Sequence, residues 1–399
     1  MKIGINASFL RKENTGIGQV TINFLKKLME IPNSNFQIPN KSQITNNKIS
    51  NFEFVLYLEE DIDLKLPNNF QKRIFLPLWK RDDLIRKIWW EKYSLPKIVK
   101  KDECDVFLSL YQSTTILPNK VKHLMVVHDI IPKLFPEYLN NSRKKKYWKL
   151  TEKAILEADK IIADSKRTEK DLIQHLGIDS DKITVNYPDV DEIYKKNISD
   201  EKSAKILRKY KIKQGYIYHG GGLEVRKNTE SVIRAYKILL EKFAGSYQGK
   251  FPQLVISGKL MPELAPLIFD AEKLVKELNL TKEVKLLDFV PQVDLPAIYA
   301  RALMFIYPSK YEGFGLPILE AMNQGTPVIT AKTSSLPEVG GDAVLYCNPD
   351  DVYDLVMVMK NVLTNENIRH TLSERGKERA KNFSWDKFTE KVLHIIDNL

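Results

Sequence analysis

Two acidic residues and a pair of glycines stand close together in the stretch Glu312-Gly-Phe-Gly-Leu-Pro-Ile-Leu-Glu320. An apolar run that ends at Pro308 predicts a strand before this stretch, and Pro317 suits the first position of a helix after it. Gly325 is expected to end that helix in a left-handed conformation. Free N–H groups and the positive dipole end of such a helix bind anions, and the glycines leave room for one. The pattern therefore predicts a phosphate at the helix and sugar hydroxyls at the two carboxylates.

A second glycine loop carries two cations, in His219-Gly-Gly-Gly222-Leu-Glu-Val-Arg226-Lys227-Asn228. The arginine can grip two phosphate oxygens at once, while the lysine acts as a mobile point charge. Gly222 and its neighbours free the backbone to approach a ligand, so the loop predicts a diphosphate site. The residue orders of a P-loop and of a Gly-x-Gly-x-x-Gly dinucleotide site are both missing. A surface turn with two solvated charges is the alternative interpretation.

Two weaker candidates lie earlier in the chain. Gly16 and Gly18 stand at the start of a helical pattern, where they could bring the backbone close to a phosphate. An ordinary glycine turn is the alternative. His128 and Asp129 follow a predicted buried strand, at the strand end where ligands bind to parallel α/β sheets. His128 could position or polarise a substrate hydroxyl there, and a hydrogen-bonded structural histidine is the alternative.

The elements that must position these residues alternate between strand and helix patterns, which is typical of parallel α/β folds. Two Rossmann-like domains would leave a cleft bordered by the carboxyl ends of their strands. We expect strands in the first half at Ile3–Asn6, Phe52–Leu58, Arg73–Leu76, Val106–Leu110, His123–Val127, Lys160–Ala163 and Ile183–Asn186. In the second half we expect Tyr216–His219, Leu254–Ser257, Val284–Leu287, Leu303–Tyr307, Val328–Thr330 and Ala343–Cys347.

Composition narrows the class of protein further. The chain has 399 residues, 43% of them hydrophobic, and no apolar run reaches the roughly 20 residues of a membrane span. Its two cysteines, Cys104 and Cys347, match no metal spacing, which favours a reducing, cytoplasmic compartment. The net charge of +11 lies entirely in residues 1–150, which hold 26 Lys and Arg against 15 Asp and Glu. Such a field attracts phosphates, anionic lipids or nucleic acid, although a solvated basic face is equally compatible.

One aromatic and basic stretch, from Trp79 to Lys101, allows two interpretations. A membrane-surface helix is one. The favoured one is a core helix in which Ile88, Trp89, Tyr93 and Leu95 pack. No nucleic-acid-binding motif accompanies these residues. The polar segment Pro32–Asn51 predicts a long mobile surface loop.

Taken together, the motifs resemble those of the retaining glycosyltransferases of family four, the group 1 glycosyltransferases. The resemblance covers almost the whole chain. Gly16-Ile-Gly18 and Val127-His-Asp-x-Ile-Pro132 look most like the branch that contains bacterial polysaccharide mannosyltransferases. The motifs that carry it best are Tyr307-Pro-Ser-x-Tyr-Glu-Gly-Phe-Gly-Leu-Pro-x-Leu-Glu-Ala-Met322, Gly325-Thr-Pro-Val, Leu336-Pro-Glu338, Glu224-x-Arg226-Lys227-Asn228 and Ala163-Asp-Ser165.

The resemblance implies a GT-B fold, in which two Rossmann-like α/β domains face a deep cleft. Residues 1–188 would form the acceptor domain and residues 189–384 the nucleotide-sugar donor domain. A C-terminal helix at about 385–399 would pack back on the first domain.

The resemblance also implies roles for single residues. Glu312 would contact hydroxyls of the donor sugar, Glu320 would hold the ribose, and Arg226 and Lys227 would bind the diphosphate. The backbone that surrounds the phosphate and sugar would come from Gly16, Gly18, Gly222, Phe314, Gly315 and Leu316. His128 and Asp129 would lie on the acceptor side. The sequence departs from the pattern at Gln19 and Gly221, where relatives often carry arginine, and at Asp189, where glycine is common.

The function implied is transfer of a hexose, with mannose from GDP-mannose as the candidate donor, to a polysaccharide or lipid-linked glycan. O-antigen, capsule or another surface glycan would be the product. Neither a metal nor a cofactor is expected, because fixed cations and helix N-termini can stabilise the leaving diphosphate. The location would be cytoplasmic or peripheral on the inner membrane face, with no nucleic acid partner. The alternatives are a glycan phosphorylase of the same fold, for which no pyridoxal-binding lysine motif is seen, and a catalytically silent membrane- or glycan-binding subunit.

Overall fold

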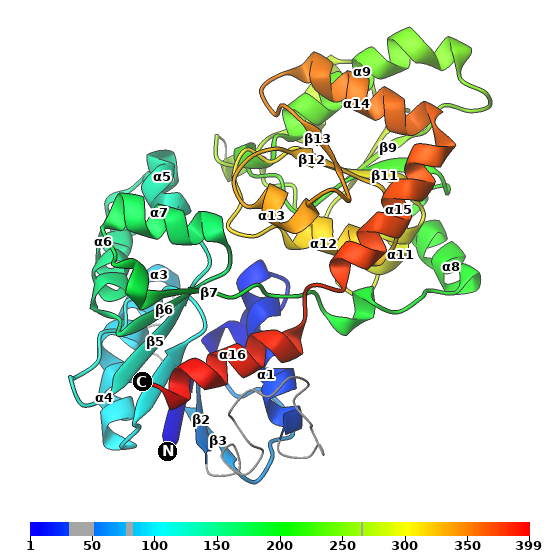
Figure 1. Cartoon of the computed structure of the whole chain (residues 1–399). Helices are drawn as coiled ribbons and strands as arrows, with labels where there is room; N and C mark the ends of the chain where they lie inside the picture. Colours follow the sequence, from blue (N-terminus) through cyan, green and yellow to red (C-terminus); the bar gives the residue numbers. More distant parts are fainter. Residues whose placement is uncertain (32–51, 77–82, 265) are drawn as a thin grey trace. The chain divides into compact units, whose positions relative to one another are not determined.

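The computed structural model describes residues 1–31, 52–76, 83–264 and 266–399 (Figure 1). The chain divides into two compact units: unit 1 comprises Met1–Asp189 and Phe383–Leu399, and unit 2 comprises Val190–Asn382. The domain limits expected from the sequence lie one or two residues from these. The loop expected over Pro32–Asn51 and the residue Trp79 lie outside the described residues.

Unit 1 is built on a parallel sheet whose described strands have the order β3-β2-β1-β4-β5-β6-β7. In the register of its centre, Ile5 lies opposite Leu56 on one side and Leu108 on the other. The inner strands are buried on both faces, as parallel strands covered by helices must be. The strands are β1 (Lys2–Asn6), β2 (Glu53–Leu58), β3 (Phe70–Ile74), β4 (Val106–Ser109), β5 (Lys122–Val127), β6 (Lys160–Ala163) and β7 (Ile183–Val185).

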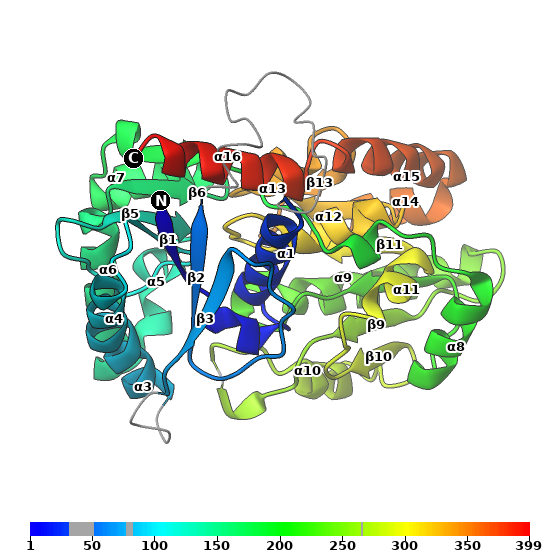
Figure 2. The same cartoon turned by 90° about the horizontal axis from the view of Figure 1, so that it is seen from below.

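Helices flank this sheet (Figures 1 and 2). Val55 and Tyr57 of β2, for example, share a core cluster with Leu95 and Val99 of α4. The helices of unit 1 are α1 (Gly16–Glu30), α3 (Asp83–Trp89), α4 (Leu95–Lys101), α5 (Ile131–Leu134), α6 (Ser142–Glu157), α7 (Lys166–Leu176) and α16 (Trp385–Asp397). Shorter turns are η1 (Ser8–Lys12), the π turn η3 (Trp90–Ser94), η4 (Pro136–Leu139) and η5 (Ser180–Lys182).

The last helix of the chain, α16, packs against α1 (Figure 1). The rings of Phe24 and Phe388 meet edge to face, with centroids 5.9 Å apart. The ammonium of Lys27 lies 3.1 Å from the carboxylate of Asp386. The Asn186 amide donates to the carbonyl oxygen of Phe388 at 2.9 Å. These contacts hold the C-terminal segment on the first unit.

Unit 2 has a second parallel sheet, whose described strands have the order β10-β9-β8-β11-β12-β13. The strands are β8 (Tyr216–His219), β9 (Leu254–Ser257), β10 (Val284–Leu287), β11 (Ala302–Tyr307), β12 (Val328–Ala331) and β13 (Leu345–Cys347). The helices are α8 (Asp200–Tyr210), α9 (Thr229–Phe243), α10 (Ala271–Glu277), α11 (Leu295–Ala300), α12 (Leu316–Asn323), α13 (Leu336–Gly340), α14 (Val352–Thr364) and α15 (Glu366–Ala380). Shorter turns are η6 (Glu192–Tyr194), η7 (Val225–Lys227), η8 (Ala244–Ser246) and η9 (Pro262–Leu264).

The helical segment 83–101 corrects one expectation from the sequence. Leu95 is buried as predicted, but Trp89 and Tyr93 are 47% and 51% exposed, so their assignment to the core was wrong. Trp90 is buried instead, stacked on Phe75 with ring centroids 5.1 Å apart. A π turn holds more residues than an α turn, so η3 changes which side chains face inward. Of the helices that the structure describes, none combines the length and apolar character needed to cross a bilayer.

Gly18 provides a test of the local packing of α1. A Cβ added there would lie 2.0 Å from the carbonyl oxygen of Lys12, whereas one added at Gly16 would meet nothing within 4 Å. We expect Gly18→Ala to destabilise the protein by about 2 kcal/mol or more, because the backbone must shift. Gly16→Ala should be neutral or stabilising by up to about 1 kcal/mol. Urea unfolding of both variants checks this, and equal midpoints would contradict the described packing.

Candidate active site

The candidate site of unit 2 lies where its sheet reverses direction. From β8 the chain continues to β9 on one side, while β11 lies on the other side of β8. The loops after β8 and β11 therefore leave the sheet edge next to each other, at the topological switch point where ligands bind to such sheets. The first loop carries Arg226 and Lys227, and the second carries Glu312. The two motifs that the sequence indicated separately are thus brought together.

Hydrogen bonds of the Asn228 side chain and of the Arg226 backbone hold the loop after β8 against the loop after β11. The Asn228 amide donates to the carbonyl oxygens of Pro308, at 3.3 Å, and Pro349, at 2.7 Å. The carbonyl oxygen of Arg226 accepts from the backbone N–H of Lys310 at 2.8 Å and from the Ser309 hydroxyl at 3.1 Å. Asn228 takes a left-handed conformation, with φ at 63°, which asparagine tolerates well. The two cations therefore sit on a braced turn.

Glu312 is the centre of the site. Its Oε1 lies 2.7 Å from the Arg226 guanidinium and 2.7 Å from the Lys227 ammonium. The same oxygen accepts from the hydroxyls of Tyr307, at 2.8 Å, and Ser309, at 2.7 Å. The Glu312 N–H donates to the Ser334 hydroxyl at 2.9 Å. Among the described residues these contacts to the carboxylate all use Oε1, which leaves Oε2 as the oxygen available for a ligand.

Burial makes these charges strongly interdependent. Glu312 is 7% exposed and Lys227 5%. Burial by itself raises the pKa of Glu312, but Arg226 and Lys227 outweigh it and bring that pKa down to about 2. Burial and the neighbouring Arg226 lower the pKa of Lys227, and Glu312 opposes this shift. The carboxylate therefore keeps both cations charged in a site largely withdrawn from water.

Two residues of the site were quoted from the sequence only as part of a family motif. The Tyr307 hydroxyl accepts a short hydrogen bond from Lys227 and donates to Glu312, so it bridges cation and anion. Ser309 links Glu312 to the β8 loop through the Arg226 carbonyl. Both stand at the carboxyl end of β11, and that position at a predicted strand end was the signal that could have identified them.

The helix α12 begins directly after the second loop, as the sequence predicted. Gly315 precedes it with φ at 123°, a conformation that residues with a Cβ rarely adopt. Pro317 lies in its first turn, and Gly325 follows its end with φ at 69°, which confirms the predicted left-handed stop. Phe314 is buried and Leu316 partly buried at the helix start. The backbone at Phe314, Gly315 and Leu316 therefore lies beside Glu312 at the helix N-terminus.

Glu224 adds a second carboxylate to the cation pair. It stands at the turn before Arg226, and its charge raises the pKa of both Arg226 and Lys227. Gly222 has φ at 108°, a conformation that favours glycine, and a Cβ added there would lie 2.4 Å from Glu224 Oε2. Glu224 Oε2 is buried and accepts no hydrogen bond from any described residue. Sequence analysis assigned Glu224 no role beyond its place in the motif.

Glu320 lies one turn into α12 and is partly buried. The Tyr299 hydroxyl donates to its Oε2 at 2.9 Å. Burial raises the pKa of Glu320 to about 7, although the hydroxyls of Tyr299 and Tyr194 oppose the shift. Glu320 thus titrates near neutral pH, in contrast to Glu312, which stays ionised. The environments of the two carboxylates push their pKa values apart.

In unit 1 the structure gives His128 two partners that the sequence did not reveal. Its Nδ1 lies 2.5 Å from Oδ2 of Asp164, and its Nε2 lies 2.9 Å from the carbonyl oxygen of Leu110. Two acceptors hold the ring as an imidazolium, since both nitrogens must then donate. Burial lowers the pKa of His128, but Asp164, the Leu110 carbonyl and Asp129 together raise it by more, so the net shift of the pKa is upward. Polarising a substrate hydroxyl would require one of these bonds to break.

The other predicted residues of unit 1 occupy backbone turns. Asp129 is partly buried and accepts from the Ile131 N–H at 2.9 Å, so it caps the turn after β5. Gly16 is the first residue of α1 and is exposed, while Gly18 is buried and donates to the Thr15 hydroxyl oxygen at 3.1 Å. The backbone of Gly18 packs closely against the backbone carbonyl of Lys12.

Comparison with known proteins places the chain in a family. Residues 199–379 match the family model of glycosyl transferases group 1, and residues 53–192 match that of glycosyltransferase family 4. O-antigen chain mannosyltransferase B of Escherichia coli is 32% identical over 280 residues, which cover 70% of this chain and 71% of the relative. O-antigen chain mannosyltransferase RfbU of Salmonella typhimurium is 26% identical over 363 residues, 90% of each chain.

Solved structures agree at the level of the fold. WaaG, a glycosyltransferase involved in lipopolysaccharide biosynthesis, superposes with a TM-score of 0.72 at 16% identity, over 99% of each chain. HepE of Anabaena, solved with UDP and glucose, gives 0.69 at 16% identity over the full length of both chains. The protein belongs to glycosyltransferase family four and has the GT-B fold. The family and the fold class predicted from the sequence are confirmed.

Removal of the central charge tests the electrostatics of the site. In Glu312→Gln, Arg226 and Lys227 lose the anion between them, and breaking such a buried pair costs about 3 kcal/mol or more. Added pyrophosphate should restore part of this stability by taking the place of the carboxylate. Thermal unfolding with and without pyrophosphate measures both effects.

The control is Asp171→Asn, which breaks a buried ion pair of unit 1, where Asp171 lies 2.9 Å from Arg167. This variant should be destabilised without any extra gain from pyrophosphate. An equal response of both variants to pyrophosphate would show that the anion does not act at the Arg226–Lys227 pair.

Proposed function

We propose that the protein is a retaining, metal-independent hexosyltransferase that moves a sugar from a nucleotide diphosphate to a surface glycan or its lipid-linked precursor. The observation that carries the proposal is the contact of Glu312 with both Arg226 and Lys227, 2.7 Å from each, at the switch point of unit 2. GDP-mannose is the candidate donor, because relatives of this chain are named O-antigen chain mannosyltransferases. Nucleotide-diphosphate sugar is the donor substrate, and no cofactor takes part.

The diphosphate would be held by the two cations. Both are mostly buried, and the buried environment strengthens their attraction for an incoming anion. Negative charge builds on the diphosphate as the bond to the sugar breaks, so preorganised cations favour the transition state over the bound substrate. The backbone N–H groups at Phe314, Gly315 and Leu316 and the glycine at Gly222 would surround the same group. These fixed charges supply the stabilisation for which other transferases use a metal ion.

The sugar would be oriented by the two acids that remain available. Glu312 Oε2 can accept from hydroxyls of the transferred hexose while Oε1 stays on its four partners. Tyr307 and Ser309 would fix that carboxylate in place. Glu320 would hold the ribose. Hydrogen bonds from hydroxyls to ionised carboxylates are short and strong, so such contacts orient the donor precisely enough for reaction.

The anomeric configuration would be retained because the acceptor hydroxyl attacks the sugar on the same face that the diphosphate leaves. The departing phosphate oxygen can take the proton of the acceptor hydroxyl, so the reaction needs no separate protein base. The state of His128 supports this, because both of its nitrogens already donate within unit 1. His128 and Asp129 would then shape the acceptor side through the turn after β5.

The acceptor and location follow from the relatives and from the charge of the first half. A polysaccharide or a lipid-linked glycan would be the acceptor, since the relatives are named for O-antigen chains. The enzyme would act in the cytoplasm, peripherally on the inner membrane face, where the basic residues 1–150 meet anionic lipid. Nucleic acid is not proposed as a partner.

A transfer assay tests the proposal. The full chain is given a panel of labelled nucleotide sugars and a lipid-linked glycan acceptor, with and without EDTA. We expect one hexose to be transferred at an EDTA-insensitive rate with the donor's anomeric configuration kept, as read by NMR. Glu312→Ala should lose about a thousandfold or more of this rate, because it removes an orienting and charge-balancing group. Asp171→Asn is the control and should keep the rate; inverted product or full activity of Glu312→Ala would refute the mechanism.

The pKa of Glu320 near 7 gives a pH test of its role. Above pH 7 the ionised carboxylate offers two acceptors to the ribose hydroxyls, and below pH 7 protonation removes this advantage. Affinity for the nucleoside diphosphate should therefore rise from pH 6 to pH 8 by about threefold to tenfold more in the wild type than in Glu320→Gln. Calorimetry on both proteins separates this from titration of the nucleotide itself. If the affinities of the wild type and Glu320→Gln change with pH in the same way, Glu320 does not bind the nucleotide.

A further inference from the structure

The carboxylate of Glu320 is held by a buried tyrosine from a neighbouring helix. Tyr299 stands near the end of α11 and donates its hydroxyl proton to Glu320 Oε2 at 2.9 Å. α11 contacts α12, the helix that carries Glu320 (Figure 1). Tyr299 is only 1% exposed, whereas Glu320 is partly buried. The donor of this hydrogen bond is therefore enclosed within the unit, and its acceptor remains partly accessible.

The ring of Tyr299 is held in place by the aromatic side chains packed around it. The rings of Phe305 and Tyr218 meet it edge to face, with centroids 5.1 Å and 5.2 Å away. The ring of Tyr194 meets it in the same manner at 6.1 Å. Such pairs have a preferred geometry, so the packing fixes the position of the Tyr299 hydroxyl opposite Glu320.

Tyr299 is the tyrosine of this cluster whose hydroxyl is directed at Glu320. The Tyr194 hydroxyl donates to Gln292 Oε1 at 2.5 Å. The Tyr218 hydroxyl lies 2.6 Å from the Ser257 hydroxyl oxygen. Each of the three hydroxyls thus has its own printed partner in this part of the chain, and the carboxylate is the partner of Tyr299.

The hydrogen bond from Tyr299 favours the ionised form of Glu320. Burial and the charge of Glu320 raise the pKa of Tyr299 well above its ordinary value, so the hydroxyl keeps its proton and acts as a donor. Burial raises the pKa of Glu320 to about 7, while Tyr299, Tyr194 and the charge of Lys227 act in the opposite direction. A hydrogen bond to an ionised acceptor is stronger than one to a neutral acceptor, so its loss would leave Glu320 protonated to a higher pH.

The titratable groups around α12 come from several elements. Those that share an electrostatic interaction with Glu320 are Tyr299 of α11, Tyr194 of η6, Tyr218 of β8 and Lys227 of η7. On α15, which also contacts α12, the Lys377 ammonium lies 3.1 Å from the carboxylate of Glu374. Arg379 of the same helix donates to carbonyl oxygens of α13. These cations of α15 are therefore occupied by partners other than Glu320.

We propose that Tyr299 is a positioning residue of the nucleotide site, whose hydroxyl holds the Glu320 carboxylate in the orientation that accepts hydrogen bonds from the ribose hydroxyls. Tyr299 itself would not touch the ligand, because it is 1% exposed. A carboxylate that is fixed in advance loses less freedom on binding than a mobile one, so more of its hydrogen-bond energy contributes to affinity. This role rests on the proposed function, because it takes Glu320 to be the residue that holds the ribose.

Discrimination between ribose and deoxyribose tests this role. The probes are GDP, UDP and their 2′-deoxy forms, bound to the full-length protein in a calorimeter, and the base that binds more tightly is used. The wild type should prefer the ribonucleotide by about tenfold or more, because a missing hydroxyl leaves the carboxylate without its partner. Tyr299→Phe keeps the ring and removes only the hydroxyl, and it should reduce this preference to about threefold or less.

The pH dependence of ribonucleotide affinity gives a second reading of the same variant. Removing a donor to the ionised form raises the pKa of Glu320, so the rise in affinity should move to higher pH in Tyr299→Phe. The loss of affinity should be largest near pH 7 and smaller at about pH 9, where the carboxylate is ionised in both proteins. A role of Tyr299 in packing alone would lower the affinity by the same factor at every pH.

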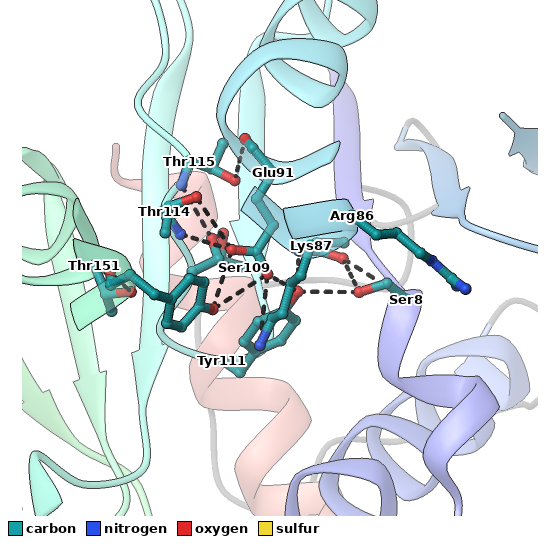
Figure 3. Close-up of polar contacts among 12 residues, drawn as sticks. Ser8, Arg86, Lys87, Glu91, Ser109, Tyr111, Thr114, Thr115 and Thr151 are labelled. Carbon is teal, nitrogen blue, oxygen red and sulfur yellow. Dashed lines mark hydrogen bonds and ion pairs between the residues drawn. The ribbon is translucent and has the colours of Figure 1, made fainter. Parts of the chain in front are cut away.

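Two control variants remove a comparable hydroxyl from another place. Tyr218→Phe removes one from the same aromatic cluster, where its partner is Ser257. Tyr111→Phe acts in unit 1, where the buried Tyr111 hydroxyl donates to the carboxylate of Glu91 at 2.6 Å (Figure 3). Both variants should unfold at a lower temperature than the wild type, yet keep its preference for ribose and its pH profile.

Glu320→Gln separates this role from the proposed function. Its preference for ribose should fall as in Tyr299→Phe. If Glu320→Gln keeps the preference of the wild type, or if neither GDP nor UDP binds, the proposed donor site is contradicted. If Glu320→Gln loses the preference while Tyr299→Phe keeps both the preference and the pH profile, only the role of Tyr299 is overturned.

Discussion

The ionised carboxylate of Glu312 is the interaction on which the candidate site depends. Two cations, Arg226 and Lys227, are carried into a mostly buried position by a turn that would be unstable without an anion between them. Glu312 supplies that anion from the next loop, so it joins two segments that lie 85 residues apart in the chain. Tyr307 and Ser309 then fix which carboxylate oxygen is used. A single charge thus connects the stability of the loops with the chemistry of the site.

The sheet explains why these loops meet. β8 and β11 are neighbours, but the chain reaches β9 before β11, so the two loops leave the sheet edge side by side at the switch point. The glycines at Gly222 and Gly315 allow the sharp turns that the short loops need. The two cations and the carboxylate of Glu312 are thereby gathered at one edge of the sheet.

Most strand positions and the site motifs could be predicted from the sequence, because they depend on the pattern of neighbouring residues. Most strands were placed within a residue or two, since buried parallel strands form short apolar runs between turns. The edge strand β3 was the exception: it covers Phe70–Ile74 rather than Arg73–Leu76, because one side of an edge strand faces solvent and its apolar pattern is broken. The Arg226, Lys227 and Glu312 motifs were recognised, but their direct contact required the topology.

Features that depend on contacts between residues far apart in the chain could not be predicted from the sequence. The partners of His128 come from Asp164, 36 residues away, and from a backbone carbonyl, so nothing near His128 in the chain reveals that both nitrogens are engaged. The exposed faces of Trp89 and Tyr93 depend on one π turn, which shifts the inward position to Trp90. Helical periodicity alone assumes a regular α-helix and therefore assigned the wrong aromatic residues to the core.

A crystal structure of the protein with bound GDP or another nucleoside diphosphate would show directly which residues hold the diphosphate. We predict that diphosphate oxygens lie within hydrogen-bonding distance of Arg226 and Lys227, that Glu312 keeps Oε1 on both cations, and that the ribose lies at Glu320. A diphosphate bound elsewhere, with the Glu312, Arg226 and Lys227 cluster unchanged and unoccupied, would contradict this prediction.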